Sequence, residues 1–384
     1  MCPCGAAARY AGRRAKTFQS VLGPLTLERA YFHCSACGAG FFPRDLALGL
    51  EGDLTPGVLR MVAAVGASVS FEEGSSLLRE LAGLTLVAKH VERAAEALGA
   101  EIAEDERAHV APLDATPLPP ALYLGMDGTG VPMCRAELAG RAGKQPDGSA
   151  KTREAKLCAV WSAEGRDEKG IPVRDEGSVS YTGAIESAAS RETDKDPPAF
   201  VARVLREAAR RRFQQAPRRG VLGDGALWIW NVADEYFPGA IQIVDLFHAK
   251  QYLSDVGKDL FGAESPEARR WAEARHDELD QGRFDALLAA VRAHAEANDA
   301  ARLCAEYLER NRHRMRYPEF RAAGLCVSSG VLEAGCKSTV GKRLKRGGMH
   351  WSVRGANAIL ALRCCRLSGR FEDFWERRST KAAA

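Results

Sequence analysis

The sequence lacks the marks of several classes of protein. None of its uncharged apolar runs approaches the ~18 residues that a membrane-spanning helix requires. The first residues, MCPCGAAARY, bring polar and basic side chains before any apolar stretch, so we expect no secretory signal. The G-x-G-x-x-G, Walker, H-E-x-x-H and G-x-S-x-G motifs are also missing, which argues against the chemistries that they serve. We therefore expect a cytoplasmic protein without membrane contact.

The composition is that of a folded protein. Of 384 residues, 46% are hydrophobic and 27% are charged, and this length favours two or three domains. The net charge of +4 hides a segregation of charge along the chain. Residues 334–370 carry nine Lys or Arg and no acid, whereas residues 51–107 carry eleven acids against five bases. Such a pattern is typical of a chain that binds a polyanion with one region, although a solvated basic surface would look the same.

Four of the eleven cysteines form two pairs near the N-terminus. Cys2-Pro-Cys4 and Cys34-Ser-Ala-Cys37 are each followed by glycine, and 29 residues separate the pairs. Two such pairs supply the four thiolates of a structural Zn²⁺ site. The segment between them predicts a β-hairpin that turns at Gly23-Pro24. The residues therefore predict a zinc-ribbon-like segment over 1–50, with a degraded, metal-free hairpin as the alternative because the first pair is C-x-C.

Residues 51–115 predict a helical module. Thr55-Pro56 marks a helix start, Ser70-x-x-Glu73 is a capping box, and Gly83 precedes a further helix. This order outlines a helix-turn-helix with Lys89, His90 and Arg93 exposed on its second helix. Residues 51–107 of the module have a net charge of −6 (5 − 11), and many small helical domains share its outline without binding DNA. A Pro-rich linker follows in HVAPLDATPLPP.

Strands and helices alternate beyond this linker and predict an α/β core. LYLGMDG and RGVLGDG each contain an apolar strand that ends at an Asp-Gly pair, Asp127 and Asp224. We interpret LWIW as a continuation of the second strand, and IQIVDLFH as another strand that ends in Asp245-x-x-His248. Open α/β sheets place their sites at such strand ends. A helical stretch over about 250–322 follows, and then Glu333 near the start of a helix. Three acids supply the oxygen ligands that Mg²⁺ prefers.

Several strings together resemble a known family. SSGVLEAGCKSTVGKRLKRGGMHWSVRGANAILALR is similar to the C-terminal signature of DDE transposases of the ISKra type, from bacterial insertion sequences. NRHRMRYPEFRAAGL, GDGALWIWNVADEYFPGAIQIVDLFHA, GMDGTGVP and YFHCSACGAGFFP also resemble that family, in the right order over nearly the whole chain.

The resemblance implies a fold and an activity. The expected fold is an RNase H-like α/β core with an all-helical insertion, preceded by the ribbon and the helical module. The implied enzyme is a polynucleotidyl transferase that cleaves transposon ends and joins them to target DNA. Its triad would be Asp127, Asp224 and Glu333 with two Mg²⁺ or Mn²⁺ ions, and Asp245 and His248 would lie nearby. Its partners would be duplex DNA, in the terminal inverted repeats and the target, and further copies of the chain as a dimer or higher oligomer on the nucleoid.

The expected DNA contacts are mostly basic and lie beyond the triad. Phosphate contacts are expected from the basic run behind the catalytic helix, and His350-Trp351 would stack or wedge at a base near the cut, although Trp351 could equally be a core residue. The expected DNA-binding residues are Lys337, Lys342, Arg343, Lys345, Arg346, His350, Trp351, Arg354, Lys89 and Arg93.

The expected domains are a ribbon at 1–50, a helical module at 51–115, the first part of the core at 116–250, the insertion at 251–325 and the end of the core at 326–384. Two alternatives stay open at this point. The chain could be a non-catalytic DNA-binding regulator, or an RNase H-like nuclease with another nucleic-acid substrate.

Overall fold

The fold was analysed in a computed structural model, which describes residues 1–50, 52–110, 117–143, 145, 148–168, 170–189, 195–328 and 330–383. Most of the expected Pro-rich linker, residues 111–116, lies outside the described residues. The chain forms two compact units. Unit 1 contains Met1–Ala108 and Lys342–Ala384, and unit 2 contains His109–Gly341. The segment 326–384, expected as one part of the core, therefore divides between the two units at Gly341.

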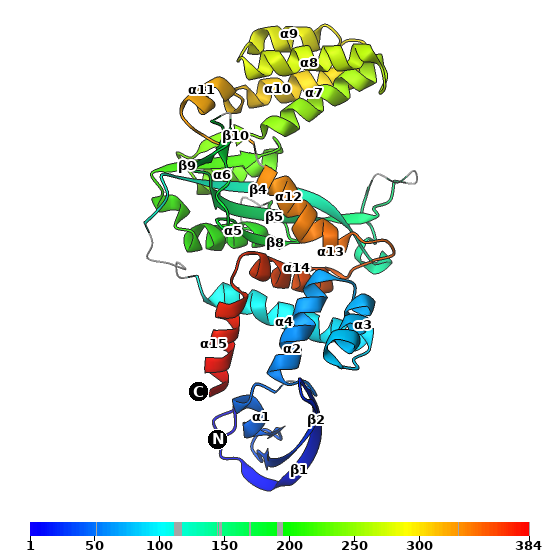
Figure 1. Ribbon diagram of the computed structural model, residues 1–384, viewed down its shortest axis with the longest axis vertical. Helices are drawn as coiled ribbons and strands as arrows, with labels where there is room; N and C mark the ends of the chain where they lie inside the picture. The colour runs from blue at the N-terminus through cyan, green and yellow to red at the C-terminus, as the bar shows by residue number, and fades with distance from the viewer. Residues whose placement is uncertain are drawn as a thin grey trace. The chain divides into compact units, whose positions relative to one another are not determined.

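Unit 1 begins with a three-stranded antiparallel sheet in the order β1-β2-β3, the blue hairpin of Figure 1. Its strands are β1 (Arg9–Ser20), β2 (Gly23–His33) and β3 (Gly40–Phe41), followed by α1 (Pro43–Ala47). The predicted hairpin is confirmed, but Ser20 pairs with Gly23, so the turn lies at Val21-Leu22. Gly23 has a φ of 104°, a left-handed value that glycine adopts without strain.

The helical part of unit 1 is built from both ends of the chain. The three helices expected in residues 51–115 are α2 (Pro56–Ser68), α3 (Phe71–Ala82) and α4 (Ala88–Ala108). The capping box is present, since the Glu73 N–H donates to Ser70 Oγ. The C-terminal segment adds α13 (Lys342–Leu344), α14 (Val353–Leu367) and α15 (Phe371–Ala383).

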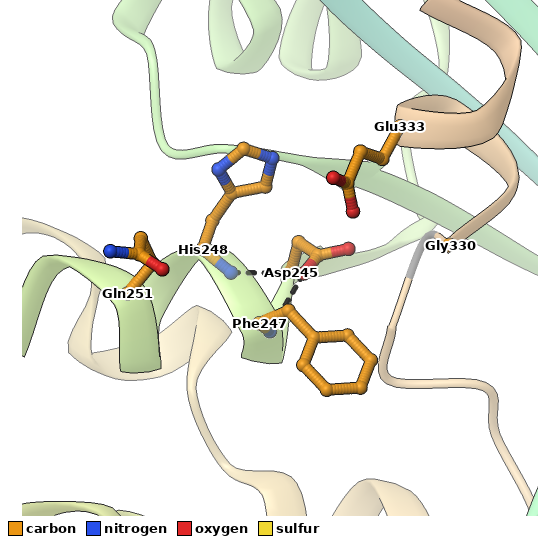
Figure 2. Close-up of a pocket in the computed structure, with 6 residues that line it drawn as sticks. All are labelled: Asp245, Phe247, His248, Gln251, Gly330 and Glu333. Atoms are coloured by element: carbon orange, nitrogen blue, oxygen red, sulfur yellow. Dashed lines mark hydrogen bonds between the residues drawn. The ribbon is translucent and has the colours of Figure 1, made fainter. Parts of the chain in front are cut away.

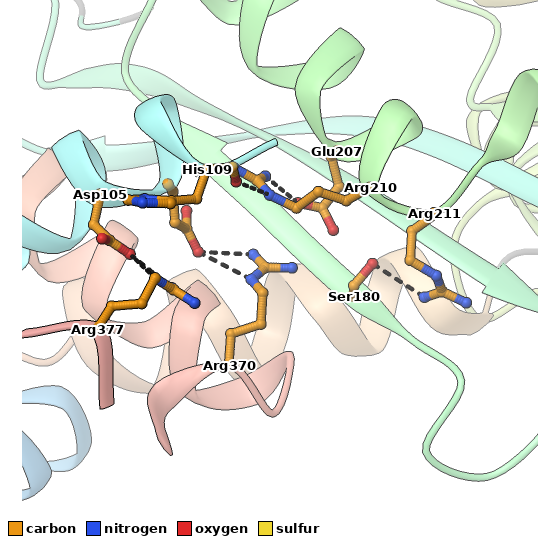
Figure 3. A network of polar contacts seen from close by, with 9 residues as sticks. Asp105, His109, Ser180, Glu207, Arg210, Arg211, Arg370 and Arg377 are labelled. Atoms are coloured by element: carbon orange, nitrogen blue, oxygen red, sulfur yellow. Dashed lines mark hydrogen bonds and ion pairs between the residues drawn. The ribbon is translucent and has the colours of Figure 1, made fainter. Parts of the chain in front are cut away.

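Helix α14 packs closely on α4, and Gly99 allows this approach. A Cβ atom at Gly99 would lie 2.1 Å from the backbone carbonyl oxygen of Ala358. Helix α15 and the residue before it are tied to α4 by two ion pairs, Arg370 to Glu106 at 2.9 Å and Arg377 to Asp105 at 2.6 Å (Figure 3). These contacts explain why the C-terminal segment belongs to unit 1.

Unit 2 is built on a five-stranded mixed sheet in the order β10-β9-β4-β5-β8. Its long strands β4 and β5 are antiparallel, β8 pairs antiparallel with β5, and β9 and β10 run parallel to β4. The strands are β4 (Ala121–Pro132), β5 (Thr152–Ser162), β8 (Ser180–Ala184), β9 (Arg218–Gly223) and β10 (Ile241–Val244), with a separate small hairpin of β6 (Gly165–Arg166) and β7 (Pro172–Val173). The α/β class expected from the sequence is confirmed.

Helices pack on the strands of this sheet. Helix α5 packs on β5 and β8, and α12 packs on β4 and β5. The helices of the core are α5 (Ala199–Arg210), α6 (Leu227–Tyr236) and α12 (Gly330–Gly335), with short turns η1 (Arg135–Glu137) and η2 (Phe213–Gln215). Within the unit, Arg210 pairs with the fully buried Glu207, and Arg211 donates to Ser180 Oγ at 3.1 Å (Figure 3).

The expected helical insertion is present between β10 and α12. It contains α7 (Leu246–Phe261), α8 (Pro266–Asp280), α9 (Phe284–Arg292), α10 (Asp299–Asn311), η3 (Arg312–Arg314) and α11 (Tyr317–Ala322). Helices α7 to α10 lie side by side beyond the β10 edge of the sheet in Figure 1. Aromatic contacts hold them together, such as Tyr252 against Tyr307 at 5.0 Å between ring centroids.

Three expectations about elements are wrong. LWIW is not strand but the start of α6, where Trp230 is buried and Trp228 packs edge-on against Phe200. Strand β4 does not end at Asp127, because its antiparallel pairing with β5 continues to Pro132. Strand β10 ends at Val244, and the next residue, Asp245, is the N-cap of α7.

Candidate functional site

The strand register brings three aspartates to one level at an edge of the sheet. In the parallel pairing of β4 with β9, Ala121 faces Arg218 and Gly125 faces Leu222, a constant offset of 97 residues (218 − 121). Continued by two residues, this offset places Asp127 level with Asp224. The pairing of β9 with β10 has an offset of 21 (241 − 220), which places Asp224 level with Asp245. Asp224 and Asp245 are each the first residue after their strand, at the edge where open α/β sheets keep their sites.

Asp127 is a carboxylate whose pKa is raised by its surroundings. It is half-buried, and burial raises its pKa above the ordinary value. Hydrogen bonds from the Cys336 thiol and the Gly128 N–H, the latter at 2.6 Å, act in the opposite direction, and the charge of Asp224 raises the pKa further. The net pKa is raised, so the folded protein holds the charge of Asp127 at a free-energy cost. A cation at this place would relieve that cost.

Asp224 is held at its position by local contacts. Its Oδ1 accepts the Ala226 N–H at 2.9 Å, and its backbone carbonyl accepts the Tyr307 hydroxyl at 2.9 Å. Gly225 has a φ of 101°, and a Cβ there would lie 2.3 Å from the Tyr307 ring. The left-handed turn and the close approach of the Tyr307 ring therefore require glycine at position 225, whatever the role of Asp224.

Glu333 reaches the same face of the sheet from α12. Helix α12 approaches closely, since a Cβ at Gly125 would lie 2.6 Å from Leu332 and one at Gly335 would lie 2.8 Å from Tyr181. Gly125 and Asp127 are two residues apart on β4 and so face the same side. The Glu333 side chain is 60% exposed and pairs with Lys337, which lowers the pKa of Glu333.

A cavity of about 130 Å³ joins Glu333 to the start of α7. Figure 2 shows the Glu333 carboxylate directed into the space between Asp245 and the His248 imidazole. Asp245 is 2% exposed and caps α7, because its Oδ1 accepts the N–H groups of Phe247 at 2.7 Å and His248 at 3.1 Å. Asp245 therefore fixes the first turn of α7, from which His248 enters the cavity.

The carboxylates of Asp127, Asp224, Asp245 and Glu333 lie around one part of unit 2, but their oxygen atoms are not close enough together to share an ion. Within the described residues, the only group of three or more His, Cys, Asp or Glu whose ligand atoms lie close enough to share an ion is the cysteine group. The Glu333 carboxylate accepts a hydrogen bond from the ammonium group of Lys337. Lys337 lies near the start of a π-helical segment, η4 (Cys336–Gly341). π-Helical turns are frequent at functional sites, where they offset a side chain within a helix.

The cysteine group is a candidate metal centre in unit 1. The Sγ atoms of Cys2 and Cys37 lie 3.6 Å apart and those of Cys4 and Cys34 lie 3.7 Å apart, and all four lie within 4.8 Å of one another. Tetrahedral Zn–S bonds of about 2.3 Å require S–S distances of about 3.8 Å. The four thiols therefore fit a metal ion such as Zn²⁺, and the compressed C-x-C pair closes the site as well as C-x-x-C does.

Backbone turns position the four thiols. The Gly5 N–H donates to the Cys2 carbonyl, and the Gly38 N–H donates to the Cys34 carbonyl, at 2.9 and 2.8 Å. Both glycines adopt positive φ, 86° and 73°, which explains the glycine after each pair. The backbone N–H of Cys37 is the largest influence on the pKa of Cys34, which is lowered to about 7.

The expected DNA-binding residues divide into exposed and buried ones. Arg343 is fully buried: its Nε donates to the Gly66 carbonyl at 2.8 Å, and its guanidinium lies over the rings of Phe71 and Trp351. Trp351 is 6% exposed and its indole N–H donates to the Leu344 carbonyl. Both are therefore core residues of unit 1, a position that the sequence left open for Trp351 but that was not expected for Arg343.

The remaining expected contacts are accessible. Arg346 pairs with Glu73, and Lys89 pairs with Glu92, both on the surface of unit 1. Lys89 and Arg93 line a cavity of about 490 Å³ on α4, where His90 pairs with Asp53. The exposed members of the expected set are Lys337 in unit 2 and Lys342, Lys345, Arg346, His350, Arg354, Lys89 and Arg93 in unit 1.

Two residues near the acids were missed from the sequence. Cys336 hydrogen-bonds Asp127, and Gln251 lines the cavity one turn beyond His248. Their spacings were a usable signal, because residues three apart on a helix share a face, as do Glu333 with Cys336 and His248 with Gln251.

Comparisons with known proteins identify no relative: no protein-family model matches the chain, and no curated protein matches it. Within the described residues, every helix is too short or too polar to span a bilayer.

Proposed function

We propose that the chain is a DNA transposase of the DDE type, which cleaves DNA at the ends of a mobile element and joins them to target DNA. The observation that carries the proposal is the common level of Asp127 on β4 with Asp224 and Asp245, which directly follow the parallel strands β9 and β10. Glu333 lies on a helix packed over the same face. This assignment implies an RNase H-like core. Three antiparallel strands followed by two strands parallel to the first, with helices inserted before the glutamate, agree with such a core.

The carboxylates of Asp127, Asp224 and Glu333 would hold the Mg²⁺ ions. Carboxylate oxygens are the donors that Mg²⁺ prefers, and the raised pKa of Asp127 is relieved by a cation. When bound, the ions supply charge neutralisation at the phosphate and activation of the attacking hydroxyl. Glu333 must first leave Lys337, and an exposed ion pair of this kind holds it by only about 0–1 kcal/mol.

The other residues of the cavity position the substrate. Asp245 holds the first turn of α7, and His248 presents its imidazole beside Glu333. From there His248 can donate a hydrogen bond to a phosphate oxygen. Lys337, once released from Glu333, provides a cation for the same phosphate.

Cleavage of DNA with matched variants tests the proposal. The substrate is duplex DNA from the ends of the element that encodes the chain, incubated with the full chain and Mg²⁺. Asp224→Asn and Glu333→Gln should lower the cleavage rate by about 10²–10⁴-fold, since metal-bound charge stabilisation is worth several kcal/mol. The controls are Asp234→Asn and Glu309→Gln, which remove acids that pair with Gln242 and Arg292 outside the cavity.

The outcomes separate the proposal from its alternatives. Cleavage by wild type and controls, and none by the two site variants, supports a transposase. Binding of end DNA without cleavage under Mg²⁺ or Mn²⁺ would identify a regulator instead. Preferential cleavage of RNA–DNA hybrids would identify a nuclease with another substrate, and equal rates in all variants would remove the catalytic assignment.

A further inference from the structure

The helical insertion contains a further cavity, of about 740 Å³, with a basic rim. The turn between α8 and α9, the η3 turn and the start of α11 form its walls. Arg312, His313 and Arg316 lie along the rim and are exposed. Phe284 and Met315, 9% and 2% exposed, form an apolar floor. None of these residues belongs to the acidic site or to the basic segment 334–370.

The chain builds this rim by alternating inward and outward residues. Arg314, between the rim residues, is 8% exposed, and its Nε donates to Gln242 Oε1 on β10 at 2.6 Å. Its guanidinium also lies 4.6 Å from the Trp230 ring centroid on α6. The buried Arg314 and Met315 thus fix η3 on the core, and Arg312, His313 and Arg316 are held outward at set positions.

The rim cations are available to an anionic ligand. Arg312 pairs with Asp285 and Arg316 with Glu319, each at 2.8 Å, and all four side chains are more than half exposed. Exposed pairs of this kind contribute about 0–1 kcal/mol, so exchanging a carboxylate for a phosphate oxygen requires little energy. A phosphate offers oxygens for two N–H groups of one guanidinium, a geometry that arginine matches better than lysine.

Ring contacts orient both guanidinium groups. Arg312 lies 5.0 Å from the Phe284 ring centroid, and Arg316 lies 5.5 Å from that of Phe320. A guanidinium stacked on a ring loses less side-chain freedom on binding than a free one, while its N–H edge stays open to a ligand. Two arginines placed in this way across one cavity suit a phosphodiester backbone.

We propose that the Arg312–Arg316 cavity binds a backbone phosphate of duplex DNA and forms a DNA contact in the helical insertion. The identity of the partner rests on the proposed function, whereas the anion-binding chemistry rests on the rim itself. Backbone contacts fix the register of a protein on a duplex without reading sequence. The insertion thus has a binding role in addition to any role as a scaffold.

A salt titration of DNA binding tests the proposal without any catalysis. Full-length wild type and Arg312→Gln/Arg316→Gln are titrated with a labelled duplex in EDTA, and affinity is measured at several salt concentrations. Each phosphate contact contributes about 0.9 to the slope of log K against log[salt]. The double variant should therefore lose about 1.8 of that slope and bind about tenfold more weakly at low salt. Arg312→Lys/Arg316→Lys keeps both charges and should retain the wild-type slope.

The matched control removes two other exposed arginines of the insertion. Arg270→Gln/Arg302→Gln changes the net charge equally, and both residues pair with acids on their own helices. An equal loss of slope in the control and the rim variant overturns the proposal, as does an unchanged slope in the rim variant. Competition by millimolar inorganic phosphate that equals competition by duplex would assign the cavity to a free phosphate and overturn the DNA contact.

The test also separates this proposal from the proposed function. If wild type cleaves end DNA and the rim variant binds DNA normally, only the rim proposal fails. If wild type binds no DNA in EDTA, the proposed function fails together with it. Circular dichroism of each variant establishes that it is folded. Where the double glutamine variant unfolds, the single variants Arg312→Gln and Arg316→Gln keep the test decisive, because each should lose about 0.9 of the slope.

Discussion

Asp127 and Asp175 are two carboxylates of unit 2 whose surroundings act in opposite directions. Burial, the largest influence on both, raises the pKa of each. At Asp127 this effect prevails, with the charge of Asp224 added to it. At Asp175 hydrogen bonds from Ser162 and the N–H groups of Gly165 and Glu164 outweigh burial and lower the pKa. The charge of Asp175 therefore stabilises the fold, and that of Asp127 opposes it.

Replacing these two aspartates by asparagine should change stability in opposite directions. A raised folded pKa means that the ionised form at pH 7 is less stable in the fold than in the unfolded chain. Asp127→Asn removes that charge and should raise the thermal midpoint of the metal-free protein by a few degrees. Asp175→Asn should lower it. The measurement is thermal unfolding in EDTA, and a fall in both midpoints would contradict the account of Asp127. Asp127→Asn should also abolish DNA cleavage, the combination expected where function requires an unfavourable charge.

At the scale of elements, Asp280 connects three helices of the insertion. It lies at the end of α8 and accepts from Lys250 on α7 and from Arg321 on α11, the latter at 2.8 Å. Burial is the largest influence and raises its pKa, but the two hydrogen bonds outweigh it, and the net pKa is lowered. The ionised form is thus more stable in the fold than in the unfolded chain.

The contribution of Asp280 should depend on pH in a defined direction. A lowered folded pKa gives stability that is complete above the unfolded value of about 3.9 and is lost as the pH falls through the folded pKa. Asp280→Asn should therefore destabilise by about 1–3 kcal/mol at pH 7 and at pH 5, and the difference from wild type should shrink below about pH 4. Denaturant unfolding at several pH values measures this. The control Asp299→Asn removes an 88% exposed partner of Arg302 and should have no measurable effect.

Elements with local signals were predicted from the sequence, and elements set by tertiary contacts were not. The alternation in 9–33 predicted the hairpin, and Ser70 with Glu73 predicted the start of α3. LWIW alternates like a strand, yet the left-handed turn at Gly225 and the packing of Trp230 place it in a helix. Strand β8 was not predicted, because its five buried residues, SYTGA, have no apolar alternation of their own.

The acids of the site were predictable, but their surroundings were not. Asp-Gly pairs after apolar runs marked Asp127 and Asp224, and the register aligns them. The pairing of Glu333 with Lys337 follows from their i, i+4 spacing. Arg343 was misjudged because a basic run predicts a solvated surface, whereas Phe71, far away in sequence, packs against its guanidinium.

At the scale of the whole molecule, the chain returns after Gly341 to the unit in which it began. No turn or linker in the sequence marks the boundary at Gly341, because the helical segment from α12 to α13 continues through it. Its physical cause is the fit of α14 on Gly99 and of α15 on Asp105 and Glu106. Such contacts between distant segments leave no periodic trace in either segment.

Two separately packed units should respond separately to loss of a metal. The cysteine site closes the hairpin sheet of unit 1, whereas unit 2 has its own buried sheet with Tyr123 stacked on Trp161. We expect one Zn²⁺ per chain in metal analysis. Its removal by a tight chelator should then increase backbone hydrogen exchange in β1 and β2 and leave β4 and β9 protected.

Cysteine variants make this last prediction specific to the site. Cys37→Ser should release the metal and reproduce the chelator's exchange pattern, because three thiolates close a tetrahedral site poorly. Cys134→Ser, in unit 2 and outside the cluster, should keep one Zn²⁺ and the wild-type pattern. Loss of protection in β4 and β9 to the same extent as in β1 would show that the two units unfold together. Unchanged exchange in β1 after complete metal removal would contradict this prediction. It would show that the cross-strand pairs of β1 and β2 are sufficient to hold the hairpin together without metal.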